Sequence, residues 1–300
     1  MRVINEGIKL STSYDLKDLY KICEKHDVVS GTVIKFNPED GFSIDLGNNI
    51  IAKMSLEDIE DSKNISLNSA ILKVGKNIMA YIKNIDENNI VYLNRALLQS
   101  DYKKEKLENL KVGTVFNTTV ISLASFGAFV DMGIGILGLL PIGDVSIARF
   151  SNIRDVFKVG DNITVVYKGK SDNGYVVSHK ELLGTWEENL ADFKYGEFCQ
   201  GIIREIMPYG AFIEIAPNLT GLADFPEGFD IHTGDSVCVM LKSSNPEKLK
   251  VKLQIVSISE VPYKIKYNYK IKDGILSEWR YTPIGSNKQI CSKFDGIIKS

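Results

Sequence analysis

Neither cysteine nor histidine occurs in a spacing that would hold a metal ion or support redox chemistry. The four cysteines stand far apart, at Cys23, Cys199, Cys238 and Cys291. Because no CxxC pair is present, neither a zinc knuckle nor a redox dithiol is predicted. The three histidines are equally scattered, at His26, His179 and His232, and we expect them at the surface or at strand ends. No metal site is therefore expected.

Long apolar runs and a large charge imbalance are also missing. No stretch is long enough for a signal peptide or a membrane span, which favours a cytoplasmic protein without a membrane partner. The chain has 36 Lys and Arg residues against 38 Asp and Glu residues. A near-neutral chain is not a strongly basic nucleic-acid binder, so any affinity for phosphates must be modest and local.

Signals of catalysis or of a bound cofactor are weak. We find no pair of carboxylates expected to share one face, so the chain is not predicted to be an enzyme. Gly133, Gly135 and Gly138 spell the GxGxxG of a dinucleotide site, but Leu139, Leu140 and Pro141 follow in place of a helix start. A tight turn between strands explains these glycines, and no small-molecule cofactor is expected.

What the sequence does contain is a repeated phrase, in which an apolar strand leads into aromatic-Gly-Ala-Phe and then into a Gly-Leu turn. Two copies, within 112–146 and 195–225, align almost without gaps. An earlier copy within 28–59 keeps the pattern, but Asp40 and Ser43 replace its aromatic residues. The chain of 300 residues therefore holds three units, of which the first is degenerate.

Each unit contains five short strands with period-two alternation and no crossover helix, which predicts an all-β protein of three tandem five-stranded OB-fold barrels. Short helices join the barrels, and Ser13 is a candidate cap for the first of them. The predicted segments are an N-terminal helix (1–25), barrel one (26–99), a helical linker (100–110), barrel two (111–182), a second linker (183–194), barrel three (195–260) and a basic hairpin or tail (261–300). Trp186 is predicted to wedge between barrels two and three.

The segment from Tyr263 alternates Tyr and Ile with Lys and turns at Asp273 and Gly274, which predicts a hairpin. Two interpretations stay open. Its Tyr and Ile face covers barrel three while Lys264 and Lys266 offer a track for RNA, or it is an edge strand that lysines protect from aggregation.

The phrase FGAFVDMG, with the later KVGD and SHKELLGTWEEN, resembles the S-one RNA-binding domain of the largest small-subunit ribosomal protein. The layout is similar to that of short three-repeat proteins of this family from Gram-positive anaerobes. The resemblance implies single-stranded RNA binding through the first and fourth residues of the aromatic phrase, which are Phe126, Phe129, Tyr209 and Phe212. The chain departs from the family where Pro141 and Asp224 replace a histidine, and where residues 170–175 lack an Asp and an Arg.

Two interpretations of the aromatic residues are possible. OB barrels stack bases on aromatic side chains, but strict alternation places Phe126 and Phe129 on opposite faces unless Gly127 permits a bulge or bend. Otherwise one ring of each pair belongs to the core. Phosphate contacts are predicted from cations near these rings, at Arg149, Lys168, Lys170, Lys248 and Lys250, although scattered lysines also serve solubility alone.

The sequence thus predicts a protein that binds single-stranded RNA with little sequence preference, such as an mRNA at the small ribosomal subunit. The alternative is an interaction scaffold that docks through barrel one, which carries Asp40, Asp58, Glu60 and Asp61.

Overall fold

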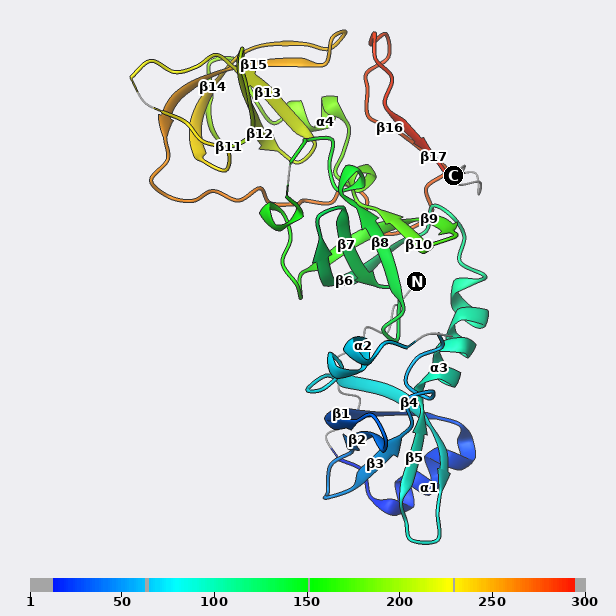
Figure 1. The fold of residues 1–300 in the computed structure, drawn as a ribbon. Coiled ribbons are helices and arrows are strands. Elements are labelled where there is room, and N and C mark those ends of the chain that lie inside the picture. The colour runs from blue at the N-terminus through cyan, green and yellow to red at the C-terminus, as the bar shows by residue number, and fades with distance from the viewer. Residues whose placement is uncertain (1–12, 63–64, 151, 229, 295–300) are drawn as a thin grey trace. The chain divides into compact units, whose positions relative to one another are not determined.

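The structure is a computed structural model that describes residues 13–62, 65–150, 152–228 and 230–294. Its main elements are three closed five-stranded barrels (Figure 1). In each barrel the strands follow the order one, two, three, five, four, and the third and fifth strands are parallel. This is the topology of the OB fold. The prediction of three tandem barrels is confirmed.

The strand bounds are as follows. Barrel one contains β1 Val28–Asn37, β2 Gly41–Asp45, β3 Ile51–Met54, β4 Asn77–Ile85 and β5 Val91–Asn94. Barrel two contains β6 Val115–Ala124, β7 Gly127–Asp131, β8 Leu137–Pro141, β9 Asn162–Ser171 and β10 Gly174–Ser178. Barrel three contains β11 Phe198–Met207, β12 Gly210–Ala216, β13 Leu219–Ala223, β14 Ser236–Asn245 and β15 Lys250–Ile258.

The glycine of the aromatic phrase is needed where the second strand begins. A Cβ atom on Gly127 would meet the carbonyl oxygen of Leu140 at 2.3 Å, and one on Gly210 would meet that of Ala223 at the same distance. Gly41 stands in the same relation to Met54 in barrel one. Only glycine allows the second and third strands to approach so closely at this corner.

Short helices flank the barrels. They are α1 Leu16–Lys25, α2 Leu67–Ile71, α3 Arg95–Tyr102, a π-helical turn Lys103–Leu107 and α4 Trp186–Leu190. Asp15 caps α1 by accepting the amide of Asp18 at 2.8 Å, so the prediction of Ser13 as the cap was wrong. Aspartate satisfies a free amide of the first turn as serine would, and it lies one residue before the helix. In the described part of the chain, no helix has the length and hydropathy to cross a bilayer.

The chain divides into two compact units. One unit holds barrel one with its helices, together with Asp131–Leu137. The other holds the rest of barrel two, barrel three and the C-terminal segment. Within this second unit Trp186 is 4% exposed and belongs to one apolar cluster with Leu182 of barrel two and the core of barrel three. The predicted wedge at this junction is confirmed.

The C-terminal segment differs from the prediction. Residues 259–277, here called the strap, form a single irregular extended segment (Figure 1, orange). The chain does bend at Asp273 and Gly274, where Gly274 has a φ of 98°, but the predicted hairpin across this bend was wrong. The hairpin lies further on, where β16 Glu278–Arg280 pairs with β17 Cys291–Lys293. Alternation survives in the strap, because a segment packed on one side buries every second residue just as a strand does.

Candidate nucleic-acid interface

Two pairs of aromatic rings lie on the outside of barrels two and three. Phe126 is 56% exposed and Tyr209 is 61% exposed, whereas Phe129 and Phe212 are half-buried. Each pair meets edge to face, with ring centroids 6.0 Å apart in barrel two and 6.3 Å apart in barrel three. The interplanar angles are 90° and 86°. Neither member of either pair belongs to a barrel core.

A turn, rather than a bulge at Gly127, brings the two rings to one face. Phe126 lies in the two-residue turn between β6 and β7, and Tyr209 lies in the equivalent turn before β12. Strand alternation does not apply to turn residues, so each can lean toward the ring that follows on the strand. The backbone irregularity predicted at Gly127 is found on the facing strand, where register shifts between Val120 and Ser122.

Barrel one presents other residues at these positions. Its loop ends in Asp40, and Ser43 of β2 is opposite Lys53 of β3, which in turn pairs with Tyr92 of β5. Lys53 is exposed and Tyr92 is half-buried, with its hydroxyl 3.5 Å from the Asp86 carboxylate. Among its described residues, barrel one therefore has a cation and one ring on this face, but not the edge-to-face pair.

Lys168 lies at the bulge of β9 and is neutralised by a carboxylate. Its ammonium nitrogen is 2.9 Å from one oxygen of Asp144, and the ammonium of Lys180 is 2.6 Å from the other oxygen. Barrel one repeats the arrangement with Lys83 and Asp58 at 2.9 Å. The carboxylate raises the pKa of Lys83 through a hydrogen bond and its charge. These ion pairs hold the lysines in place at the barrel surface. The neighbouring carboxylates weaken the electrostatic attraction of the lysines for phosphate.

Barrel three lacks this neutralisation. Lys242 occupies the same bulge position in β14 and is exposed, and in the described chain no carboxylate lies within ion-pair distance of it. Lys248 lies in the turn between β14 and β15, and Lys250 begins β15, both exposed. Lys252 follows in the same row as Phe212, since Leu222 pairs with both residues, but its ammonium is paired with the Asp224 carboxylate at 3.6 Å and is not counted among the free cations. The free cations of this interface therefore concentrate on barrel three.

The remaining predicted cations are distributed more widely. Lys170 of β9 is exposed, with its nitrogen 5.6 Å from the centre of the Tyr175 ring, a cation–π distance. Arg149 is exposed and lines a groove of about 620 Å³ between barrels two and three, together with Lys288. Lys264 and Lys266 of the strap are exposed, and Lys264 also lines a cavity beside the strap.

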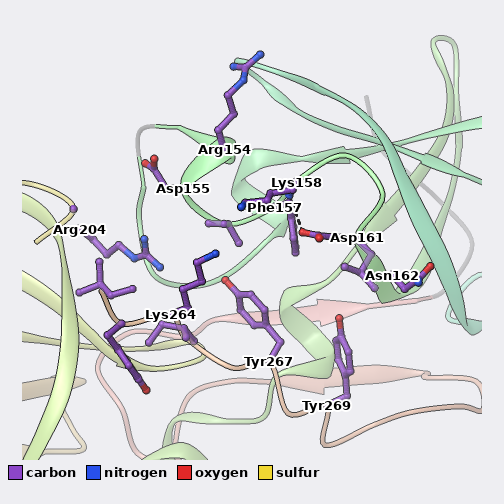
Figure 2. A pocket seen from close by; sticks show the side chains of 16 residues that line it. Arg154, Asp155, Phe157, Lys158, Asp161, Asn162, Arg204, Lys264, Tyr267 and Tyr269 are labelled. Atoms are coloured by element: carbon purple, nitrogen blue, oxygen red, sulfur yellow. Dashed lines mark hydrogen bonds between the residues drawn. The ribbon is translucent and has the colours of Figure 1, made fainter. Parts of the chain in front are cut away.

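The strap packs mainly against barrel two, which differs from the interpretation in which its Tyr and Ile face covers barrel three. Tyr269 donates its hydroxyl hydrogen to Nε2 of His179 at 3.0 Å and accepts the amide of Thr164 at 3.1 Å. Tyr267 contacts the rings of Phe157 and His179. Figure 2 shows Lys264, Tyr267 and Tyr269 along the cavity of about 560 Å³ that the strap forms with both barrels.

His179 is completely buried, which corrects the expectation of a surface position. It follows β10, and its Nδ1 donates to the carbonyl of Val145 at 2.7 Å. Burial lowers the pKa of His179 from 6.5 to about 4, although the backbone bond opposes this shift. The ring is therefore neutral at pH 7, and its unprotonated Nε2 accepts from Tyr269.

Sequence reasoning missed three groups on these faces: Lys242 and Lys252 of barrel three, the neutralising Asp144, and Lys53 with Tyr92 in barrel one. The bulge lysines follow a recognisable signal, because a lysine comes near the end of the fourth strand in every repeat. The ion pair of Lys168 joins residues 24 positions apart and depends on closure of the barrel. No group of three metal-binding side chains occurs in the residues the structure covers.

Comparison with known families defines the class of these barrels. Residues 23–94 and 109–180 match the model of the S1 RNA binding domain family. Two segments of the chain therefore match S1 RNA binding domains, the family that the aromatic phrase of barrel two resembles. The matched segments contain barrels one and two, so the degenerate first repeat belongs to the family as well. Barrel three has the same strand order.

Curated relatives narrow the comparison further. The chain is 26% identical over 276 residues to the small ribosomal subunit protein bS1 homolog of Bacillus subtilis, which covers 87% of this chain and 69% of that protein. It is 29% identical over 255 residues to the small ribosomal subunit protein bS1 of Mycobacterium tuberculosis, covering 79% of this chain. The chain spans about half of the mycobacterial protein, 51%.

One solved structure is similar over much of the chain. A multidomain protein with nucleic acid binding domains from Streptococcus pneumoniae aligns with 77% of this chain and 73% of its own, at 12% identity and a TM-score of 0.27.

Proposed function

We propose that the chain binds single-stranded RNA through the outer faces of barrels two and three, with bases stacked on the two ring pairs. The observation that supports this most directly is the matching geometry of Phe126 with Phe129 and of Tyr209 with Phe212, outside the cores. A base that stacks on an exposed ring shields the ring from water, and each such stack contributes about 1–3 kcal/mol to binding. Stacking accepts every base, so low sequence specificity follows.

The charges suggest unequal roles for the two barrels. Lys168 of barrel two is neutralised by Asp144, whereas Lys242, Lys248 and Lys250 of barrel three have no carboxylate within ion-pair distance in the described structure. Barrel three thus supplies most of the attraction for phosphates, and barrel two contributes mainly stacking. Lys170, Arg149 and the strap lysines extend the positive surface between them.

The decisive experiment is fluorescence anisotropy of an unstructured RNA of about 12 nucleotides, within the site size of OB folds. Replacing one exposed ring in each barrel, Phe126→Ala/Tyr209→Ala, removes two stacks of at least about 1 kcal/mol each, so affinity should fall about 30-fold or more. Tyr20→Ala/Phe198→Ala removes two rings of similar exposure, 43% and 62%, from other surfaces, and it should bind as wild type does. Equal affinity of the two double variants would refute the proposal.

A cellular role is proposed from the relatives, which are named as small ribosomal subunit proteins. We extend that association to this chain, with mRNA as the RNA and the cytoplasm as the compartment. No catalytic step is part of this proposal. Because the chain spans only part of these relatives, it need not share all their contacts.

The interaction scaffold remains a second candidate because of barrel one. Of its four notable carboxylates, Asp58, Glu60 and Asp61 pair with lysines, at 2.9, 2.6 and 2.9 Å. Asp40 instead lines an open groove of about 470 Å³ with Glu39 and Glu57. A basic protein surface would be complementary to this groove.

A charge-reversed variant tests the second candidate in the full chain. Glu39→Lys/Asp40→Lys should abolish co-sedimentation with ribosomes if barrel one docks there, whereas Glu87→Lys, in an exposed turn of the same barrel, should not. Unchanged co-sedimentation of the double variant would exclude docking through this groove.

A further inference from the structure

We propose that Asn218 is a positioning residue that locks barrels two and three together, so that one RNA strand contacts both ring pairs at a fixed separation. This inference rests on the proposed function and specifies how its two sites cooperate. Asn218 lies between β12 and β13, is completely buried and has a left-handed backbone, with φ of 60°.

The side chain of Asn218 bonds only to barrel two and its linker. Its amide oxygen accepts from the hydroxyl of Ser146 at 3.1 Å and from the amide of Ile147 at 2.9 Å. Its amide nitrogen donates to the carbonyl oxygens of Lys180 at 2.7 Å and Gly184 at 3.2 Å. The two N–H groups of the side-chain amide each donate one bond and its oxygen accepts two, so its hydrogen-bonding capacity is fully used.

The backbone of Asn218 adds a third part of the chain to the junction. Its carbonyl oxygen accepts the hydroxyl of Tyr281, which is buried beside Trp279 in the C-terminal segment. One residue of barrel three therefore connects barrel two, the linker and the C-terminal segment. Since three of these five bonds are buried and two are partly buried, loosening the junction would leave several polar groups without partners.

The lock is connected to both ring pairs. In barrel two, the loop that bonds Asn218 begins at Ile142, whose amide donates to the carbonyl of Phe126 at 2.9 Å. Lys180, which accepts from Asn218, also holds Asp144 and through it Lys168. In barrel three, β12 extends from Phe212, past a register shift between Glu214 and Ala216, to the turn of Asn218.

A groove beside the lock offers a path between the ring pairs. It is lined by Ile142 of barrel two and by Glu205 of barrel three, which pairs with Phe212 across the strands. Its exposed cations are Arg149 and Lys288, against the single free carboxylate of Glu205. The positive balance favours a phosphodiester segment running from one ring pair to the other.

A fixed separation changes how affinity depends on RNA length. An RNA that occupies one barrel gains nothing from the other barrel, whereas a longer strand binds the second site intramolecularly, at a high effective concentration. If the barrels moved independently, the second site would add much less. Asn218 therefore controls how much the affinity increases when the RNA is long enough to reach both barrels.

The test compares two unstructured RNAs. The RNA of about 6 nucleotides is long enough to occupy one OB barrel, and the RNA of about 24 nucleotides is long enough to occupy two. Asn218→Gly tolerates the left-handed backbone and removes only the side-chain amide. We expect it to bind the short RNA as wild type does and the long RNA at least about 10-fold more weakly. Arg149→Ala/Lys288→Ala should likewise weaken only the long RNA.

Asn49→Gly is the matched control, because Asn49 has the same φ of 60° in the equivalent turn of barrel one and is exposed. It should preserve the gain from length. Tyr281→Phe is a milder variant, because it removes only one hydroxyl at the junction and keeps the ring. It should reduce the gain in affinity with RNA length partially. Thermal unfolding of each variant reports its stability.

The outcomes separate the two proposals. An unchanged ratio of long to short affinity in Asn218→Gly and Tyr281→Phe overturns the lock and leaves RNA binding standing. A parallel loss for both RNAs assigns Asn218 to general stability and also overturns the lock. Wild type that binds neither RNA overturns the proposed function itself.

Discussion

Acidification should destabilise the unit of barrels two and three through one residue, His179. The ring must be neutral in the folded protein, because Nδ1 donates to Val145 and Nε2 accepts from Tyr269. Its pKa is about 4 in the folded state and close to 6.5 when unfolded. Between these values the unfolded chain binds a proton that the folded chain does not, so stability falls as pH falls through this window.

The magnitude follows from the two pKa values. At pH 5 the unfolded histidine is almost fully protonated and the folded one is mostly neutral, which removes about 2 kcal/mol of the free energy of unfolding relative to pH 7.5. Below pH 4 the loss approaches its limit of about 3.4 kcal/mol. Other groups titrate as well, so the quantity of interest is the part of the loss that disappears in a variant without His179.

Urea denaturation followed by tryptophan fluorescence suits this measurement. Both tryptophans, Trp186 and Trp279, are buried in the unit that contains His179. His179→Gln should be less stable than wild type at pH 7.5, and it should lose about 2 kcal/mol less between pH 7.5 and pH 5. His232→Gln is the control, since that side chain is 80% exposed. Equal pH dependence of wild type and His179→Gln would refute the reasoning.

Two further predictions concern the barrels themselves. Gly127→Ala should cost about 1–3 kcal/mol in urea denaturation, because its Cβ would overlap a backbone oxygen, whereas Gly143→Ala, with open space around it, should be neutral; equal stabilities would contradict the close approach. Lys250→Gln should weaken RNA binding and reduce the slope of log affinity against log salt by about 0.7, the value for one phosphate contact to a single strand. Lys168→Gln should change that slope less, because a carboxylate already neutralises Lys168. A larger change for Lys168 would show that RNA displaces this carboxylate.

The repeat was sufficient to predict the barrels because it records local constraints. Gly127 and Gly210 recur at one position since the backbone of the third strand leaves no space for a side chain there. Alternation of buried and exposed residues identifies strands in the same way, as in β15, where Val251, Leu253 and Ile255 are buried. Features that depend only on neighbours in the chain are readable from the sequence.

The errors share a different origin, which is dependence on distant partners. His179 lies 90 positions before Tyr269, and nothing in either local pattern indicates that they meet. The strap alternates like a strand, but its alternation reflects packing against barrel two rather than pairing with a second strand. From the sequence, Lys168 was predicted to be a phosphate contact. In the closed barrel it is paired with Asp144, which lies 24 positions before it in the chain.

The three barrels show how one fold is given different tasks by a few outward residues. The inner glycine is retained in all three, whereas the outward position two residues later holds Ser43, Phe129 or Phe212. At the bulge of the fourth strand each barrel keeps a lysine, and only barrel three leaves it without a neighbouring carboxylate in the described structure. Because these outward side chains contribute little to the core, they can change without loss of the fold. Barrel one has no outward edge-to-face ring pair among its described residues, barrel two has one beside a neutralised lysine, and barrel three has one beside free lysines. RNA affinity should therefore rise from barrel one to barrel three.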